Sequence, residues 1–296
     1  MDTHAHTQDP ATPIDAPQLL LVLIDQHWDN YQSERELCRN EFSSEAVRGL
    51  RIATRRMLAL VQLLRRLNLG PNLQKLRCTF KDQLDGFDSL RDVQVILAEI
   101  SGTIQELPGL LLFQEYLQKR EKRLLRSVKK IFKQVKRGDT AKRIVKRSEI
   151  LKNRAIENIP IRMLHAVDEA FLTTLQRVNW VNSSDSATIH RVRLAFKKFR
   201  YMVEMIHPTL GNFPQENLKR MKNYQGAMGR IQDIEILLRS LSDFASSSST
   251  FDPKPVLHLF EQRHVAAISG YLEEMYDFNN FWHAASDLPF PWENIQ

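Results

Sequence analysis

Residues 45–56 read EAVRGLRIATRR, and residues 188–198 read TIHRVRLAFKK. The two stretches overlay when one of them is shifted by 142 residues. In both, apolar residues recur at steps of three and four, which places them on one face of an α-helix at about 100° per residue. The sequence therefore predicts two amphipathic helices that are copies of each other, within a chain that arose by internal duplication.

The apolar face of each copy continues beyond the quoted stretch. In the first copy it consists of Val47, Leu50, Thr54, Met57, Val61 and Leu64, and in the second of Ile189, Val192, Phe196, Phe199, Val203 and Ile206. Only Thr54 departs from the apolar pattern. Faces of this length must be buried against other helices, so the pattern favours a helical bundle.

The rest of the chain supports an all-α fold. No segment alternates apolar and polar residues as a strand does, and glycine is scarce, with 10 residues in 296. Helical periodicity bounded by Gly and Pro predicts the following helices: 18–39, 43–68, 72–101, 109–136, 139–157, 160–180, 186–207, 214–243 and 254–277. Residues 1–17 are expected to form a flexible tail, and residues 281–296 an irregular C-terminal tail.

Composition excludes several classes of protein. With 43% hydrophobic and 26% charged residues, the chain is not disordered throughout. Its two cysteines, Cys38 and Cys78, rule out a disulfide framework and a four-cysteine zinc site. No apolar run approaches the 18 residues of a membrane span, and no secretory signal is seen. We therefore expect a cytoplasmic protein without membrane contact.

Positive charge is concentrated in one segment. Residues 118–154 contain sixteen Lys and Arg against three acids, a charge of +13, whereas the whole chain carries +7. A basic segment on a mildly acidic body is typical of a protein that binds a polyanion. The alternative is a solvated basic helix, and the sequence does not say whether this segment lines a binding site or an outer surface.

A second set of cations follows the two repeated helices. Arg48, Arg51 and Arg55 lie beside the apolar face of the first copy, and His190, Arg193 and Lys197 lie at the matching positions of the second. Arg56 matches Lys198. Cations beside a buried face either line a groove that binds an anion, where low dielectric strengthens a phosphate contact, or extend over the edge of the core. Because the spacing occurs twice, we favour the groove.

The repeat continues one helix later, now at a shift of 141 residues. Lys81 matches Lys222, and Asp92 matches Asp233. The two lysines are candidates for the same groove. The two aspartates are candidates to accept hydrogen bonds from the arginine rows and to hold their guanidinium planes, or else are ordinary surface acids.

These half-motifs resemble the CHAD domain, the conserved histidine α-helical domain. Its half-motif combines a histidine, an arginine three residues later and a basic cluster, and His190, Arg193, Lys197, Lys198 and Arg200 fit it in the second half. Arg51, Arg55 and Arg56 fit it in the first. The resemblance covers about residues 18–280. In the first half, Arg48 stands in place of the family's histidine and Leu58 in place of a later arginine.

The resemblance implies two pseudo-symmetric four-helix bundles, at 18–137 and 138–280, whose basic helix faces form a central channel. The family binds inorganic polyphosphate there and is associated with polyphosphate granules, and it is not known as a catalyst by itself. The polyphosphate-binding residues implied for this chain, together with the two lysines of the second repeat, are Arg48, Arg51, Arg55, Arg56, Lys81, His190, Arg193, Lys197, Lys198, Arg200 and Lys222. Since Arg48 replaces one histidine, a metal bound by a symmetric histidine pair is not expected.

No motif of an enzyme, metal site or cofactor site is present: there is no P-loop, no His-Glu-x-x-His and no Cys-x-x-Cys. We therefore expect a binding protein without cofactor or metal. Two alternatives stay open. The basic segment also suits a nucleic-acid-binding protein, although its helices carry few aromatic residues and no recognition signature. A helical scaffold for an acidic protein partner is the third interpretation.

Overall fold

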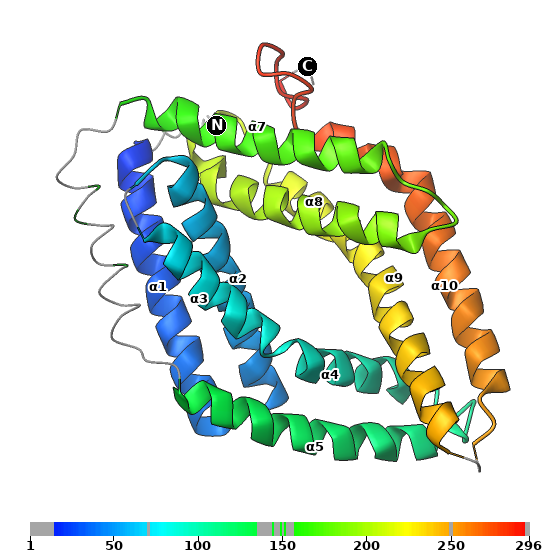
Figure 1. Cartoon of the computed structure of the whole chain (residues 1–296). Coiled ribbons are helices and arrows are strands. Elements are labelled where there is room, and N and C mark those ends of the chain that lie inside the picture. The colour runs from blue at the N-terminus through cyan, green and yellow to red at the C-terminus, as the bar shows by residue number, and fades with distance from the viewer. Residues whose placement is uncertain are drawn as a thin grey trace, which may run out of the picture.

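The protein is described here from a computed structural model that covers residues 15–69, 72–134, 144, 149, 151, 157–248 and 251–293. Within these ranges it is helical and has no β-strand (Figure 1). The all-α prediction is confirmed. The elements are α1 (Ala16–Glu41), α2 (Ser44–Arg66), α3 (Leu73–Asp85), α4 (Asp88–Ser101), α5 (Leu110–Gln134), α7 (Ile159–Val178), α8 (Ser186–Ile206), η1 (His207–Thr209), α9 (Gln215–Ser247), α10 (Lys254–Glu274) and η2 (Met275–Phe281).

The repeated stretches form α2 and α8, and every residue of their two predicted apolar faces is buried. Thr54, the polar exception, satisfies its hydroxyl by donating to the carbonyl of Leu50 at 2.7 Å. Each helix starts at a polar cap that accepts a backbone N–H: Ser43 Oγ from Ala46 at 3.1 Å, and Asp185 Oδ1 from Ala187 at 3.0 Å. The local sequence therefore fixes both the start and the buried face of each copy.

The prediction of a single helix over residues 72–101 is wrong. The chain forms α3 and α4, with Gly86 and Phe87 between them. Both residues keep right-handed helical angles, but Phe87 N–H donates to the carbonyl of Leu84, a tighter i→i−3 bond that bends the chain. The corresponding part of the second half is the unbroken helix α9. The bend places Asp88 at the start of α4, beside α2.

The helices follow one another around the molecule in Figure 1: α1 to α3 on one side, then α7 and α8, then α9 and α10, with α4 and α5 closing the fourth side. Helices that correspond to each other in the repeat are also in contact: α2 packs against α8, and α4 packs against α9. The predicted pseudo-two-fold relation between halves, and the division at residues 137 and 138, stay predictions.

Two hydrophobic cores hold these helices, and each draws on both halves of the repeat. The larger joins α1, α2 and α3 to α7, α8 and the first part of α9. The smaller joins α4 and α5 to the last part of α9 and to α10. The α2–α8 contact and the α4–α9 contact therefore lie within continuous cores, which fix the distance between the cation rows on these helices.

The C-terminal segment, residues 282–293, packs on α7. Trp282 Nε1 donates to Asp168 Oδ1 at 2.8 Å, and His283 Nε2 lies 2.8 Å from the same oxygen. Trp282 and Trp292 are both buried. At the other end, α1 begins at Ala16, two residues before the predicted start, while residues 1–14 and most of the predicted helix 139–157 lie outside the described residues.

Candidate functional site

A cleft of about 500 Å³ lies between the two halves, and five helices line it. They are α2, α3 and α4 from the first half and α8 and α9 from the second. Its lining consists of Arg51, Arg55, Leu58, Gln62, Arg77, Lys81, Leu84, Asp85, Asp88, Arg91, Asp92, His190, Arg193, Leu194, Lys197, Gln232, Ile236 and Arg239. Eight of these side chains are Lys or Arg, against three aspartates, so the cleft carries a formal positive excess.

The cations of the first half are tied to carboxylates. Arg51 is only 4% exposed; its Nη2 donates to Asp88 Oδ1 at 2.9 Å and its Nη1 to the carbonyl of Leu84 at 3.3 Å. Lys81 pairs with Asp85, one turn along α3. These intramolecular pairs neutralise Arg51 and Lys81. Arg55 is then the cation of the α2 row that lines the cleft without a described carboxylate partner.

Arg91 connects the two halves across the cleft. Its Nη2 donates to Asp233 Oδ1 of α9 at 2.9 Å and its Nη1 to Asp92 Oδ1 at 3.3 Å. Burial lowers the pKa of this guanidinium, but the two carboxylates outweigh it and the net shift is upward. The two aspartates thus hold a guanidinium plane, as expected, but that of Arg91 and not those of the α2 and α8 rows.

The cations of α8 differ, because no described carboxylate pairs with Arg193 or Lys197. Three buried polar atoms here have no hydrogen-bond partner among the described residues: His190 Nδ1 and Arg193 Nε of α8, and Gln232 Oε1 of the neighbouring α9. Buried polar groups are almost always paired, and an unpaired one costs about 1–3 kcal/mol. All three belong to residues that line the cleft, so the wall is arranged for a polar ligand.

The pKa values show how strongly these cations affect one another. Burial, together with repulsion from Arg55, Arg193 and further guanidinium groups, lowers the pKa of Lys197 to about 6. The same two causes lower the pKa of Arg55 to about 10 and that of Arg193 in the same direction. A lysine whose pKa is lowered by burial and by surrounding cations is typical of a functional site, because a bound anion would restore its charge.

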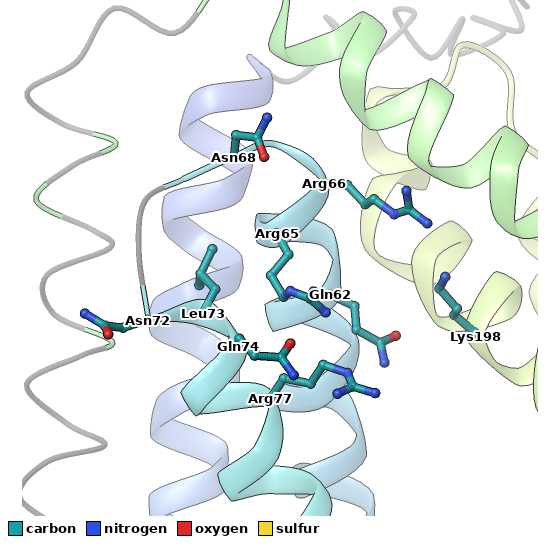
Figure 2. Close-up of a pocket in the computed structure, with 9 residues that line it drawn as sticks. All are labelled: Gln62, Arg65, Arg66, Asn68, Asn72, Leu73, Gln74, Arg77 and Lys198. Atoms are coloured by element: carbon teal, nitrogen blue, oxygen red, sulfur yellow. The ribbon is translucent and has the colours of Figure 1, made fainter.

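A second, larger hollow of about 1180 Å³ adjoins the cleft and shares Gln62 and Arg77 with it. Figure 2 shows Lys198 of α8 standing across this hollow from the residues of α2 and α3. The other lining residues are Arg65, Arg66, Asn68, Asn72, Leu73 and Gln74, so the described lining has four cations, four amides and no carboxylate. Burial and the neighbouring Arg66 lower the pKa of Lys198.

The structure brings together most of the residues predicted from sequence. Arg51, Arg55, Lys81, Asp92, His190, Arg193 and Lys197 line the cleft, and Lys198 lines the adjoining hollow. Asp233 reaches the cleft through its pair with Arg91. Leu58, which stands where the CHAD half-motif has an arginine, is one of four large apolar side chains in the lining.

Four predicted cations line neither hollow. Arg48 is 72% exposed and pairs with Glu45 at 3.6 Å. Arg56 and Lys222 are exposed elsewhere. Arg200 is buried, donates to Gln225 at 2.9 Å and pairs with Glu204, so its charge is already neutralised within α8 and α9.

Sequence reasoning missed the remaining cations of the two hollows, namely Arg65, Arg66, Arg77, Arg91 and Arg239. Arg91 directly precedes Asp92, which the second repeat singles out, but Arg91 itself was not predicted. Arg77 corresponds to Leu218 and Arg239 to Ala98 at the repeat shift, so a search for matched pairs discards both. The contacts of α3 and α9 with the repeated rows bring them to the cleft, and the sequence carries no signal for these contacts.

The described residues hold no group of three His, Cys, Asp or Glu side chains placed to bind a metal ion. Among the described helices, none is long and apolar enough to cross a membrane.

Comparison with known proteins agrees with the sequence motifs. Residues 22–242 match the sequence profile of the CHAD domain. Among solved structures, the chain resembles the CHAD domain from the plant Ricinus communis, with a TM-score of 0.69 and 18% identity, over 96% of this chain and 98% of the plant chain. It also resembles PptA from Streptomyces chartreusis, with a TM-score of 0.66 and 15% identity, over 90% and 100% of the two chains. No curated protein matches the sequence.

Proposed function

Since the chain belongs to the CHAD domain family, we propose that it binds inorganic polyphosphate in the cleft between α2 and α8. The observation that carries this proposal is the α8 wall of the cleft. There, Arg193 and Lys197 have no described carboxylate partner, and the buried atoms His190 Nδ1 and Arg193 Nε lack a hydrogen bond among the described residues, as does Gln232 Oε1 on the adjacent α9. An anion that accepts hydrogen bonds would satisfy the donors among them and neutralise the charge.

The ligand that fits is a long, flexible chain with about one negative charge on each phosphate and no bases. Arg55 and Arg193 offer planar pairs of donors that match phosphate oxygens, and Lys197 offers a point charge. Among the described residues, no Phe, Tyr or Trp lines either hollow, so these residues offer no platform on which a base would stack. The donors therefore favour bare phosphate over a nucleic acid.

The two hollows give such a chain a path. They share Gln62 and Arg77, so a polymer that occupies the cleft can continue past Lys198. The carboxylate beside this path is Glu169, which is paired with Arg66 at 2.6 Å. We propose that this path is the basic channel expected for the family. The protein acts there as a binder without catalysis or cofactor, in the cytoplasm and on polyphosphate granules.

The proposal is tested by a competition titration at about 0.15 M salt. Purified protein is bound to labelled long-chain polyphosphate and challenged with RNA of equal charge, short polyphosphate and orthophosphate. We expect long polyphosphate to win and orthophosphate not to compete. Affinity should fall steeply with salt, since each neutralised phosphate releases counterions.

The matched variants are Arg193→Glu with Lys197→Glu in the cleft, and Lys219→Glu with Arg230→Glu on the exposed face of α9 outside both hollows. Both pairs change the formal net charge equally. We expect the cleft variant to lose at least about tenfold in affinity and the α9 variant to lose less than about threefold. Equal losses, or equal competition by RNA, would show that the protein attracts polyanions only through its overall charge.

A further inference from the structure

Helix α5 carries a second basic surface that the cleft does not use. Its exposed cations recur at helical spacing, so at 100° per residue they fall within a stripe about 120° wide and about 16 Å long. We call this the α5 stripe; it consists of Lys119, Lys122, Arg123, Arg126, Lys129 and Lys130. It accounts for part of the +13 segment seen in the sequence.

The opposite face of α5 is buried in the two hydrophobic cores, which keeps the stripe oriented toward solvent. Leu110, Phe113 and Leu117 are buried in the smaller core, and Val128 and Phe132 in the larger one. Figure 1 shows α5 along the outer edge of the molecule, with α4 between it and the interior. A helix held in this way cannot turn, so the six cations project from a rigid ridge.

Little within the described protein neutralises the stripe. Lys119 lies 4.0 Å from Glu115, and Lys129 lies over the ring of Phe42 at 5.9 Å. Glu121, the acid within this run of cations, accepts a hydrogen bond from Gln94 of α4 at 3.1 Å. Described carboxylates form no ion pair with the other four cations of the stripe. Neither hollow of the candidate site includes a residue of α5, so the two basic surfaces are separate.

The shape of the stripe selects among polyanions. A flexible chain gains contacts inside a concave cleft, where several walls surround it, but on a convex ridge it would lose freedom for one row of contacts. A nucleic-acid duplex is already stiff, with about one charge per 1.7 Å of axis, so a 16 Å row of cations meets phosphates that need no ordering. The core face of α5 is buried, and its exposed apolar residues are Leu111 and Leu112, one turn or more before the first cation of the stripe. The stripe itself therefore has no apolar side chain that would insert into a membrane surface.

We propose that the α5 stripe binds the backbone of a nucleic-acid duplex, independently of the cleft and without reading sequence. The stripe exposes no aromatic side chain that would stack on unpaired bases. Charge alone therefore governs the contact, as in non-specific binding. One molecule then has two polyanion surfaces of different shape, one concave and one convex.

The test measures binding of a fluorescent mixed-sequence DNA duplex of about 30 base pairs, by anisotropy, between about 0.05 and 0.2 M salt. The variant is Lys122→Glu with Arg126→Glu and Lys130→Glu. We expect its affinity for duplex to fall at least tenfold, and the slope of log K against log salt to become shallower by about 2–3, since each lost phosphate contact removes about 0.9. Its affinity for long polyphosphate should stay within about threefold.

The control carries the same charge change elsewhere: Lys219→Glu, Arg230→Glu and Lys254→Glu, three exposed positions on α9 and α10. It should keep duplex binding within about threefold, and circular dichroism of both variants establishes that they fold. The proposal is overturned if wild type does not bind duplex at 0.1 M salt, if the control loses as much as the stripe variant, or if anionic vesicles bind the stripe and duplex does not. Because the readout is duplex binding, failure here leaves the polyphosphate proposal standing.

Discussion

Arg51 of α2 and Arg193 of α8 occupy the same position in the two copies of the repeat, yet their surroundings differ. Arg51 is 4% exposed and paired with Asp88 at 2.9 Å. At the repeat shift, the residue that corresponds to Asp88 is Gly229. A Cβ placed on Gly229 would lie 4.0 Å from Arg193 Nε, the nearest atom, which itself has no hydrogen-bond partner.

The matching arginines of the two halves therefore have different roles. In the first half, the arginine fastens α2 to α4, and the bend at Gly86 brings Asp88 to it. In the second half, the absence of a side chain at Gly229 leaves the arginine open toward the cleft. Matching residues in a repeat therefore do not imply matching roles, since one neighbour decides whether a cation stabilises the fold or stays available for a ligand.

The largest effect is expected from placing a carboxylate at Gly229, so that Arg193 gains the counterpart of Asp88. Gly229→Asp should lower the affinity for long polyphosphate by about 10–100-fold, because the new carboxylate neutralises Arg193 and repels phosphate. Titration calorimetry measures the change. Gly229→Asn is the control, with the same shape and no charge, and should keep affinity within about threefold. Equal losses for both variants would mean that bulk, not charge, matters at this position.

A second difference between the halves lies one turn further on, where Arg55 matches Lys197. Because the pKa of Lys197 is lowered to about 6, the lysine is mostly neutral at pH 8 and must take up a proton when phosphate binds. Affinity should therefore fall between pH 6 and 8, by at most about tenfold per pH unit. Lys197→Arg, which copies the first half, should flatten this dependence, since arginine stays charged.

Binding measured across this pH range in wild type and Lys197→Arg decides the point. The ligand should be long polyphosphate, because its interior phosphates do not change charge between pH 6 and 8. If both proteins lose affinity in parallel, another group is responsible, and His190→Gln would then identify the histidine that lines the same cleft.

The same lysine should lower stability when no ligand is bound. Its pKa is about 6 in the folded protein and near 10.5 when unfolded, so between these values the unfolded chain binds more protons and stability rises with pH. Lys197→Met should raise the free energy of unfolding at pH 7 by about 1 kcal/mol and weaken that rise. Urea denaturation at pH 7 and pH 10 measures both, and a destabilised variant would contradict the expected strain.

The smallest effect is expected from removing the carboxylate that pairs with Arg51 in the first half. Asp88→Asn removes the charge that holds Arg51, so polyphosphate affinity should increase by about threefold, while the free energy of unfolding drops by about 0.5–1 kcal/mol. The pair is half-exposed on the aspartate side, with Asp88 57% exposed, which keeps both changes modest. A loss of affinity would show that Arg51 serves the cleft only when Asp88 orients it.

Much of the fold follows from sequence, because a duplicated apolar face leaves few ways to pack: α2, α8 and all twelve residues of their faces were predicted correctly. The bend between α3 and α4 was not, since Gly86 and Phe87 both keep helical angles and no proline marks the position. The site was predicted where the repeat supplies it, as at Arg55 and Lys197. Arg77 and Arg239 were missed because contacts between distant helices, not a shared motif, bring them to the cleft.

The two hydrophobic cores, each shared by both halves of the repeat, have a consequence for how the protein is made. When the ribosome has released only the first half, α1, α2 and α3 have no α7 and α8 to cover their apolar faces, and α4 and α5 have no α9 and α10. Folding during synthesis must wait until residues near Trp282 emerge. At about 5–20 residues per second, the residues from 138 to Trp282 take about 7–30 seconds to synthesise, so the apolar faces of the nascent first half stay exposed long enough for chaperones to bind them.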